Sequence, residues 1–277
     1  MNDKILQLFP APSHEVSLRG LYLEHDLRAH AEGLDRVFVC ANFVGSLDGR
    51  IAVPDPSGKG VALAEAITNP RDWRLFQELA VQADILITSG RYLREYAKGA
   101  KQEILQIYDD PQFEDLRNWR LSRGVSSQPD LAVISSRLDF DVPPALLEGD
   151  RSLLVFTTKS ADPDQIQRLK AQGAKVLFAG EESVDGQELC AHMTELGYRT
   201  AYSGAGPKVL HLLASSGVLD RLYLTFVNRL LGGDPYASIL EGPLLDPPLD
   251  LQLNTLYFDP YGIEGLGQLF ASYDRVE

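Results

Sequence analysis

The feature that most constrains the fold is a regular alternation of short apolar segments with helical ones. Strand-like segments rich in β-branched and aromatic residues occupy residues 37–44, 84–90, 131–135, 152–158, 175–180, 198–204 and 221–231. Helical patterns lie between most of them, at residues 68–83, 91–98, 161–173, 185–197 and 207–217. Strands separated by helices are typical of βαβ units and of a largely parallel sheet.

Two late strand-like segments, 251–258 and 268–274, have no helical pattern between them, which is typical of antiparallel edge strands. We therefore expect an α/β fold with a mostly parallel, doubly wound sheet and antiparallel C-terminal edge strands.

Local signals place the helix ends. Asn69 is a good N-cap, and Pro70 suits the first helical position. Asp162 is the expected cap of the 161–173 helix, and Asp185 and Glu188 have the spacing of a capping box.

The chain is expected to form an N-terminal arm over residues 1–35 and one domain over residues 36–277. The arm is polar and carries a short helical pattern. Residues 98–127 have mixed charges and no clear period, so we expect an insertion or a long loop there.

Composition excludes several classes of function. The formal net charge is −13, and no basic cluster offers a surface for nucleic acid. No apolar run approaches the roughly 20 residues that span a bilayer, and no leader pattern opens the chain.

Cys40 and Cys190 are expected to be buried free thiols in a reducing compartment, so a cytoplasmic protein is predicted. His25 and His30 lie among acidic residues, where a solvated surface is favoured over a metal site, and no metal is expected.

Three strand ends carry small or polar residues where open α/β sheets bind their ligands. They are residues 42–49, residues 88–90 and residues 203–207. In the last, Gly204 and Gly206 precede Pro207 at the start of a helix, which favours binding of a phosphate through backbone N–H groups. The turn is not a G-x-G-x-x-G motif, because Val209 stands where the third glycine would be.

Each strand end also has a purely structural interpretation. Asp48 precedes Gly49, and Asp-Gly is a strong turn former. Asn42 is harder to explain in this way, because a buried amide must bond either to the backbone or to a ligand.

Three segments together resemble a known family. "SLDGRIA" at 46–52, "ADILITSGRYLRE" at 83–95 and "SGAGPKVLHLLASSGVLDRLYLTFVNRLLGG" at 203–233 occur in this order in the pyrimidine reductase domain of riboflavin biosynthesis. That domain is the reductase half of bacterial bifunctional deaminase-reductases and has a dihydrofolate-reductase-like fold. The zinc deaminase signature, H-x-E with P-C-x-x-C, is absent from the sequence, so the resemblance implies a stand-alone reductase.

The resemblance implies an NADPH-dependent 5-amino-6-(5-phosphoribosylamino)uracil reductase, acting as a homodimer on a pyrimidine ribotide or a related heterocycle. Asp48 is then the catalytic candidate, and the substrate side is formed by Asn42, Ser46 and Asp48. The cofactor side is formed by Thr88, Ser89, Gly90, Ser203, Gly204, Ala205, Gly206, Leu231 and Gly232, with Gly233 beside them.

Two departures from the family concern the substrate. The family's last turn usually carries a glutamate where this chain has Gly204 or Ser203. The segment that supplies an arginine for the substrate phosphate in the family is replaced in this chain. Arg94, Arg120 or Arg123 could take over that role. Arg91 could instead meet the 2′-phosphate of the cofactor. The alternative hypotheses are therefore a nucleotide-binding protein without turnover and a reductase of the same fold with another substrate.

Overall fold

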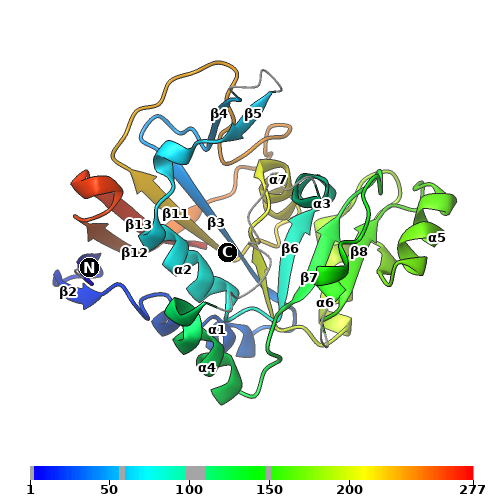
Figure 1. Cartoon of the computed structure of the whole chain (residues 1–277), viewed down its shortest axis with the longest axis horizontal. Helices are drawn as coiled ribbons and strands as arrows, with labels where there is room; N and C mark the ends of the chain where they lie inside the picture. Colours follow the sequence, from blue (N-terminus) through cyan, green and yellow to red (C-terminus); the bar gives the residue numbers. More distant parts are fainter. Residues whose placement is uncertain (1–2, 56–59, 98–109, 148–150, 277) are drawn as a thin grey trace.

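The computed structural model describes residues 3–55, 60–97, 110–147 and 151–276. In this part of the chain eleven strands form one sheet in the order β2-β1-β12-β13-β11-β3-β10-β6-β7-β8-β9 (Figure 1). Their bounds are β1 Lys4–Phe9, β2 His14–Ser17, β3 Phe38–Ser46, β6 Ile85–Ser89, β7 Asp130–Ile134, β8 Leu153–Thr157, β9 Lys175–Phe178, β10 Thr200–Ser203, β11 Arg221–Val227, β12 Leu251–Asp259 and β13 Gln268–Arg275. A separate hairpin pairs β4 (Ala52–Pro54) with β5 (Val61–Leu63).

The sheet is parallel from β11 to β9 and antiparallel beyond β11. Parallel pairing links β11 to β3, β3 to β10, and then β6, β7, β8 and β9 in turn. The strands β13, β12 and β1 add to the β11 edge with antiparallel pairing. The expected mostly parallel sheet with antiparallel C-terminal edge strands is confirmed.

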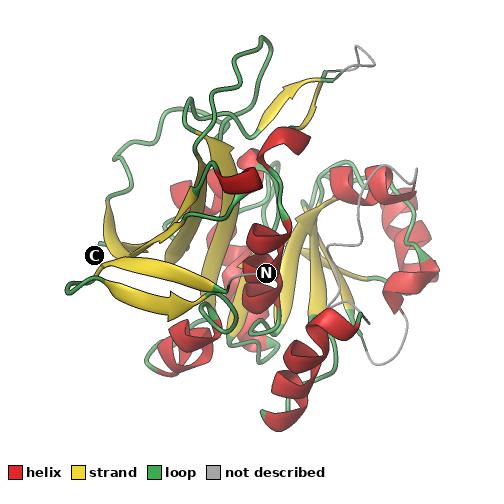
Figure 2. Cartoon of the chain, turned by 60° about the vertical axis from the view of Figure 1, so that its left-hand side comes forward, coloured by secondary structure: helices red, strands yellow, loops and turns green. Residues whose placement is uncertain are grey.

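Helices cover both faces of the sheet (Figure 2). One core contains residues of α1 (Leu27–Glu32), α2 (Pro70–Ala80), α3 (Gly90–Ala97) and α5 (Pro163–Ala171). The core on the opposite face contains residues of α6 (Gly186–Glu195) and α7 (Pro207–Ser215). Short 3-10 turns complete the described chain: η1 Leu23–His25, η2 Glu65–Ile67, η3 Pro111–Phe113, η4 Pro144–Leu147 and η5 Ile263–Gly265.

The strand order places a topological switch point, where ligands commonly bind, at the carboxyl end of β10. The chain passes from β3 to β6 and on to β9, and then returns to place β10 between β3 and β6. The next strand, β11, lies on the opposite side of β3. The connections therefore diverge at β3 and β10, which is where doubly wound sheets bind ligands beyond the carboxyl ends of their strands.

Helix caps follow the sequence signals closely. The Asn69 side chain accepts hydrogen bonds from two backbone N–H groups of α2, and Asp162 caps α5. Asp185 caps α6, but only half of the expected capping box forms, because the Asp185 N–H donates to the carbonyl of Ala179 instead.

Two regions differ from expectation. In the segment expected to be an arm, β1 pairs with β12 and carries β2 at its outer edge, so this segment extends the sheet. Within the expected long loop, residues 111–122 form η3 and the helix α4 (Glu114–Ser122), while residues 98–109 lie outside the described residues. Tertiary pairing and packing supplied the structure that local periodicity did not indicate.

Candidate active site

Three of the predicted strand ends lie side by side. Ser203 at the end of β10 is in register with Ala41 of β3 and with Ile87 of β6. Asn42, Gly204 and Thr88 therefore follow one another across three adjacent strands, within about 10 Å at the usual strand spacing. The structure thus brings Gly204 and Thr88, at the carboxyl ends of β10 and β6, beside Asn42 in the middle of β3.

The turn from β10 into α7 is shaped for an anion. Gly206 is the N-cap of α7, and no side chain caps this helix. A Cβ built on Gly206 would meet nothing within 4 Å, so the turn is open. Ser203 is buried, and its hydroxyl oxygen accepts a long hydrogen bond of 3.4 Å from the Ala205 N–H. A phosphate group fits here, because the first N–H groups of a helix lack intrahelical partners.

The end of β6 is packed more tightly. Thr88 is buried, Ser89 is partly exposed, and Gly90 begins α3. A Cβ at Gly90 would lie 2.8 Å from the Ser135 hydroxyl oxygen and 2.9 Å from the Phe140 ring. The close packing of α3 against the end of β7 therefore explains why position 90 is a glycine, without any role in ligand binding.

Asp48 lies in a dense set of hydrogen-bond donors. Its carboxylate accepts from the N–H groups of Leu231 (3.2 Å) and Gly232 (2.8 Å), from the Ser46 hydroxyl and from the Arg50 guanidinium (2.9 Å). The Ser46 and Gly232 donors hold the pKa of this carboxyl well below its ordinary value, and Arg50 adds to the effect. Asp48 is thus a firmly ionised group that joins the end of β3 to the loop after β11.

This second set of predicted residues lies farther out than the first. β3 continues five residues beyond Ala41, paired with β11 until Ser46 meets Val227. At the rise of a β-strand, those five residues cover about 16 Å. The predicted site is therefore two clusters, one at the turn before α7 and one at the Asp48 loop.

Asp72, which the sequence did not single out for the site, lies between the two clusters. It is the third residue of α2, and its Oδ1 accepts a 2.6 Å hydrogen bond from the Thr225 hydroxyl on β11. Thr225 is in register with Val44 of β3, two residues beyond Asn42 on the same face. Burial raises the pKa of the Asp72 carboxyl to about 6, although the Thr225 hydrogen bond opposes that rise.

An aromatic ring lies beside Gly204, at the turn where the resemblance led us to expect a glutamate. A Cβ at Gly204 would lie 3.2 Å from the Phe76 ring of α2. Phe76 also stacks on Trp73, with ring centroids 5.0 Å apart, and meets Tyr202 edge-on at 5.2 Å. The side chain of any larger residue at 204 would have to displace this ring.

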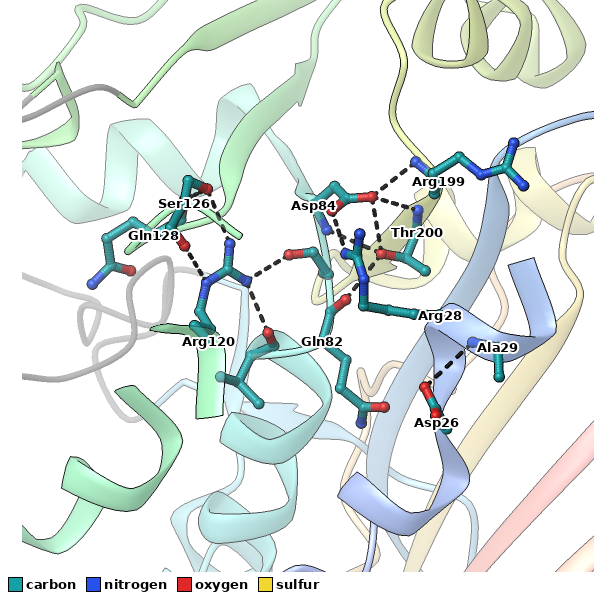
Figure 3. Close-up of polar contacts among 12 residues, drawn as sticks. Asp26, Arg28, Ala29, Gln82, Asp84, Arg120, Ser126, Gln128, Arg199 and Thr200 are labelled. Carbon is teal, nitrogen blue, oxygen red and sulfur yellow. Dashed lines mark hydrogen bonds and ion pairs between the residues drawn. The ribbon is translucent and has the colours of Figure 1, made fainter. Parts of the chain in front are cut away.

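The arginines considered for phosphate binding have other partners. Arg91 pairs with Glu95, Arg94 with Asp139, and Arg123 lies 3.8 Å from Asp26. Arg120 is buried and donates to the carbonyls of Val81 and Ala83 just before β6, and to Ser126 (Figure 3). It therefore lies at the opposite end of the strands from the predicted site.

The sequence favoured a solvated surface for His25, but the structure places this side chain in a largely buried cluster. Its ring nitrogens lie 3.0 Å and 3.1 Å from the hydroxyls of Tyr223 and Tyr257. Burial, followed by the nearby Arg221 charge, lowers the pKa of His25 to about 3. The N-terminal segment thus covers the face of β11 beside α2 with a neutral aromatic cluster.

Other features lie outside these clusters. A cavity of about 420 Å³ is lined by Glu65, Ala66, Thr68, Asn69, Pro70, Arg71, Arg229, Tyr261, Ile263 and Glu264, none of which the sequence had singled out for ligand binding. Cys40 and Cys190 are buried free thiols, as expected. Across the described ranges, no three His, Cys, Asp or Glu side chains are grouped as metal ligands, and no helix has the length and apolar character to cross a membrane.

Comparisons with known proteins identify a matching family and a shared fold. The RibD C-terminal domain family matches residues 37–261. Among solved structures, a pyrimidine reductase-like protein from Corynebacterium diphtheriae is 21% identical, covers 87% of this chain and 92% of its own, and has a TM-score of 0.66. The riboflavin biosynthesis reductase Rib7 of Saccharomyces cerevisiae is 13% identical, with coverages of 93% and 99% and a TM-score of 0.62.

RibD of Acinetobacter baumannii is 14% identical, with a TM-score of 0.60 over 89% of this chain and 60% of its own. A search of curated proteins finds no match. At these identities the solved structures establish a shared fold.

Proposed function

Because the chain belongs to the RibD C-terminal domain family, we propose that it is an NADPH-dependent reductase of a pyrimidine ribotide, resembling 5-amino-6-(5-phosphoribosylamino)uracil reductase. The observation that carries this proposal is the open, uncapped turn before α7 beside Asn42, within a chain of this family. When bound, the nicotinamide cofactor supplies the hydride.

The residues of the chain divide into two roles in this proposal. Ser203, Gly204, Ala205 and Gly206 hold the pyrophosphate through backbone N–H groups, with Thr88, Ser89 and Gly90 beside them. Asn42 lies on the substrate side and offers an amide for orientation. Asp48 and Ser46 act by holding Leu231 and Gly232 in place, since a carboxylate with four donors and a lowered pKa is a poor proton donor.

Binding is tested by titrating the protein with NADPH and NADP⁺ and following tryptophan fluorescence. The chain has two tryptophans, and Trp73 stacks on Phe76, which contacts the position of Gly204. In a Trp119→Phe variant, Trp73 alone would report binding at this turn. The absence of a response to both nucleotides at millimolar concentration would reject the reductase.

The Gly206→Asp variant tests the turn itself. We expect it to abolish NADPH binding, because a carboxylate would repel the pyrophosphate, while the melting temperature should stay unchanged, since a Cβ there meets no atom within 4 Å. A Gly206→Ala variant adds the Cβ without the charge and should keep most of the affinity. Equal NADPH affinity in the aspartate variant and the wild type would remove this turn from the site.

The second candidate is a nucleotide-binding protein with another substrate or without turnover, and the Phe76 ring in place of the turn acid favours it. Binding of NADPH without its oxidation in the presence of the aminopyrimidine ribotide would support this candidate. The homodimer stays a prediction, which sedimentation velocity would test.

A further inference from the structure

The start of α2 carries a carboxylate that the predicted site does not use. Asp72 is placed by the Asn69 cap, which accepts from the Asp72 N–H at 3.1 Å, and by the Thr225 hydroxyl at 2.6 Å. These two restraints come from a helix and from a strand of the central sheet. The carboxyl group is therefore fixed in position, and the residue stays partly exposed.

Among the residues that the structure describes, no cation pairs with the Asp72 carboxylate. The guanidinium of Arg71 bonds to Asp259 at 2.6 Å, and that of Arg74 bonds to Glu78 at 2.7 Å and to Asp115. The titratable groups that face Asp72 from other elements are the phenols of Tyr22 and Tyr202. Both are neutral at physiological pH, so burial dominates and favours the protonated acid.

The neighbouring phenols point to a polar ligand. The hydroxyls of Tyr22 and Tyr202 are buried and have no partner in hydrogen-bond geometry within the described residues. The Tyr202 hydroxyl lies near the Asn42 amide, which is itself partly exposed. Buried hydroxyls normally have partners, so unpartnered ones beside an acid and an amide are consistent with a site that a polar molecule completes.

The turn before α7, residues 203–206, carries no acidic side chain of its own. The Phe76 ring occupies the space beside Gly204, and Asp72 lies one helical turn before Phe76 on α2. The carboxylate on this side of the proposed site is therefore that of Asp72 on α2, because the turn before α7 supplies none.

We propose that Asp72, held by Thr225, is the proton donor of the reduction. This inference rests on the proposed function. A hydride adds to C1′ of the sugar, the bond between C1′ and the ring oxygen breaks, and the ring oxygen takes the proton of the Asp72 carboxyl. Asp72 then regains a proton from solvent, so each turnover consumes one hydride and one proton.

The main test compares Asp72→Asn with the wild type in reduction of the aminopyrimidine ribotide between pH 5 and 8. We expect kcat of the variant to fall by about 10²–10⁴-fold, the usual contribution of a general acid. NADPH affinity should change less than about twofold, since Asp72 lies outside the α7 turn. Glu188→Gln is the matched control, because Glu188 holds the same third position of α6 but is exposed.

The pH profile separates proton donation from a structural role. The wild-type kcat should fall as the pH rises above about 6, because the acid form is then lost. Thr225→Val should move that fall to higher pH, because it removes the hydrogen bond that stabilises the ionised form. Asp72→Asn should abolish the fall.

A titration of the free protein gives a readout independent of turnover. The carboxyl ¹³C resonance that disappears in Asp72→Asn should titrate near pH 6 in the wild type. An Asp72 pKa near the ordinary aspartate value of about 3.9 would overturn the role of Asp72 as proton donor and leave the proposed function standing. A kcat of Asp72→Asn equal to that of the wild type would do the same. An inactive wild type that binds NADPH would overturn the proposed function and this role together.

Discussion

Asp48 and Asp72 differ in how their carboxylates are satisfied, and the difference separates an anchor from a reactive group. Asp48 accepts from two backbone N–H groups, a hydroxyl and a guanidinium at the loop after β11. Within the described ranges, Asp72 accepts from the Thr225 hydroxyl and has no paired cation. The first environment lowers the pKa and the second raises it.

The two carboxylates therefore affect stability in opposite ways. A carboxyl whose pKa is lowered on folding stabilises the folded state above its unfolded pKa, and the effect is lost as the pH falls. A carboxyl whose pKa is raised on folding favours the folded state at low pH and costs stability as the pH rises through the folded pKa. A raised pKa keeps part of the Asp72 carboxyl protonated closer to neutral pH, which is why Asp72 is the stronger candidate for proton donation.

The largest effect on the fold is expected from Asp48→Ala. It leaves the N–H groups of Leu231 and Gly232 and the Arg50 guanidinium without their acceptor. We expect a clear drop in melting temperature at pH 7 that shrinks as the pH falls below about 4, where the unfolded carboxyl takes up a proton while the folded one stays ionised. The exposed Asp246→Ala is the control, and an equal melting temperature for Asp48→Ala and wild type at pH 7 would contradict the anchoring role.

A smaller effect of the opposite sign is expected from Asp72→Asn. At pH 8 the variant should be more stable than the wild type by about 1–3 kcal/mol, because the wild type must ionise a largely enclosed carboxyl. The difference should vanish below pH 4, where the acid is protonated in both the folded and the unfolded state. Urea unfolding at both pH values measures it, and a variant less stable at every pH would show that the carboxylate is structural.

The smallest effect is expected from Ser46→Ala. Ser46 is buried and its hydroxyl donates to Asp48. Loss of this bond and of the 3.1 Å bond that the Ser46 hydroxyl accepts from the Arg50 N–H should lower the melting temperature by about 2–4 °C at pH 7. In the Asp48→Ala background, Ser46→Ala should cause a smaller further drop, because only its bonds to Arg50 remain to be lost, and a fully additive drop would mean that the two side chains act independently.

The sequence alone determined the local structure around the site. Alternating apolar and helical segments predicted the parallel sheet, and Asn69, Asp162 and Asp185 cap their helices as expected. The glycine-rich turn before α7 was identified as an anion cradle and is open in the structure. These features depend on residues a few positions apart, so the periodicity and the capping residues carry the information.

The tertiary structure alone decided which distant residues meet. It placed β10 between β3 and β6, joined β1 to β12, and brought Thr225 to Asp72 across 153 positions of the chain. It also showed that Asp48 is saturated and that Phe76 fills the space beside Gly204. Sequence spacing carries no record of such contacts, because strand order, burial and the resulting pKa values arise only when the sheet and its helices pack together.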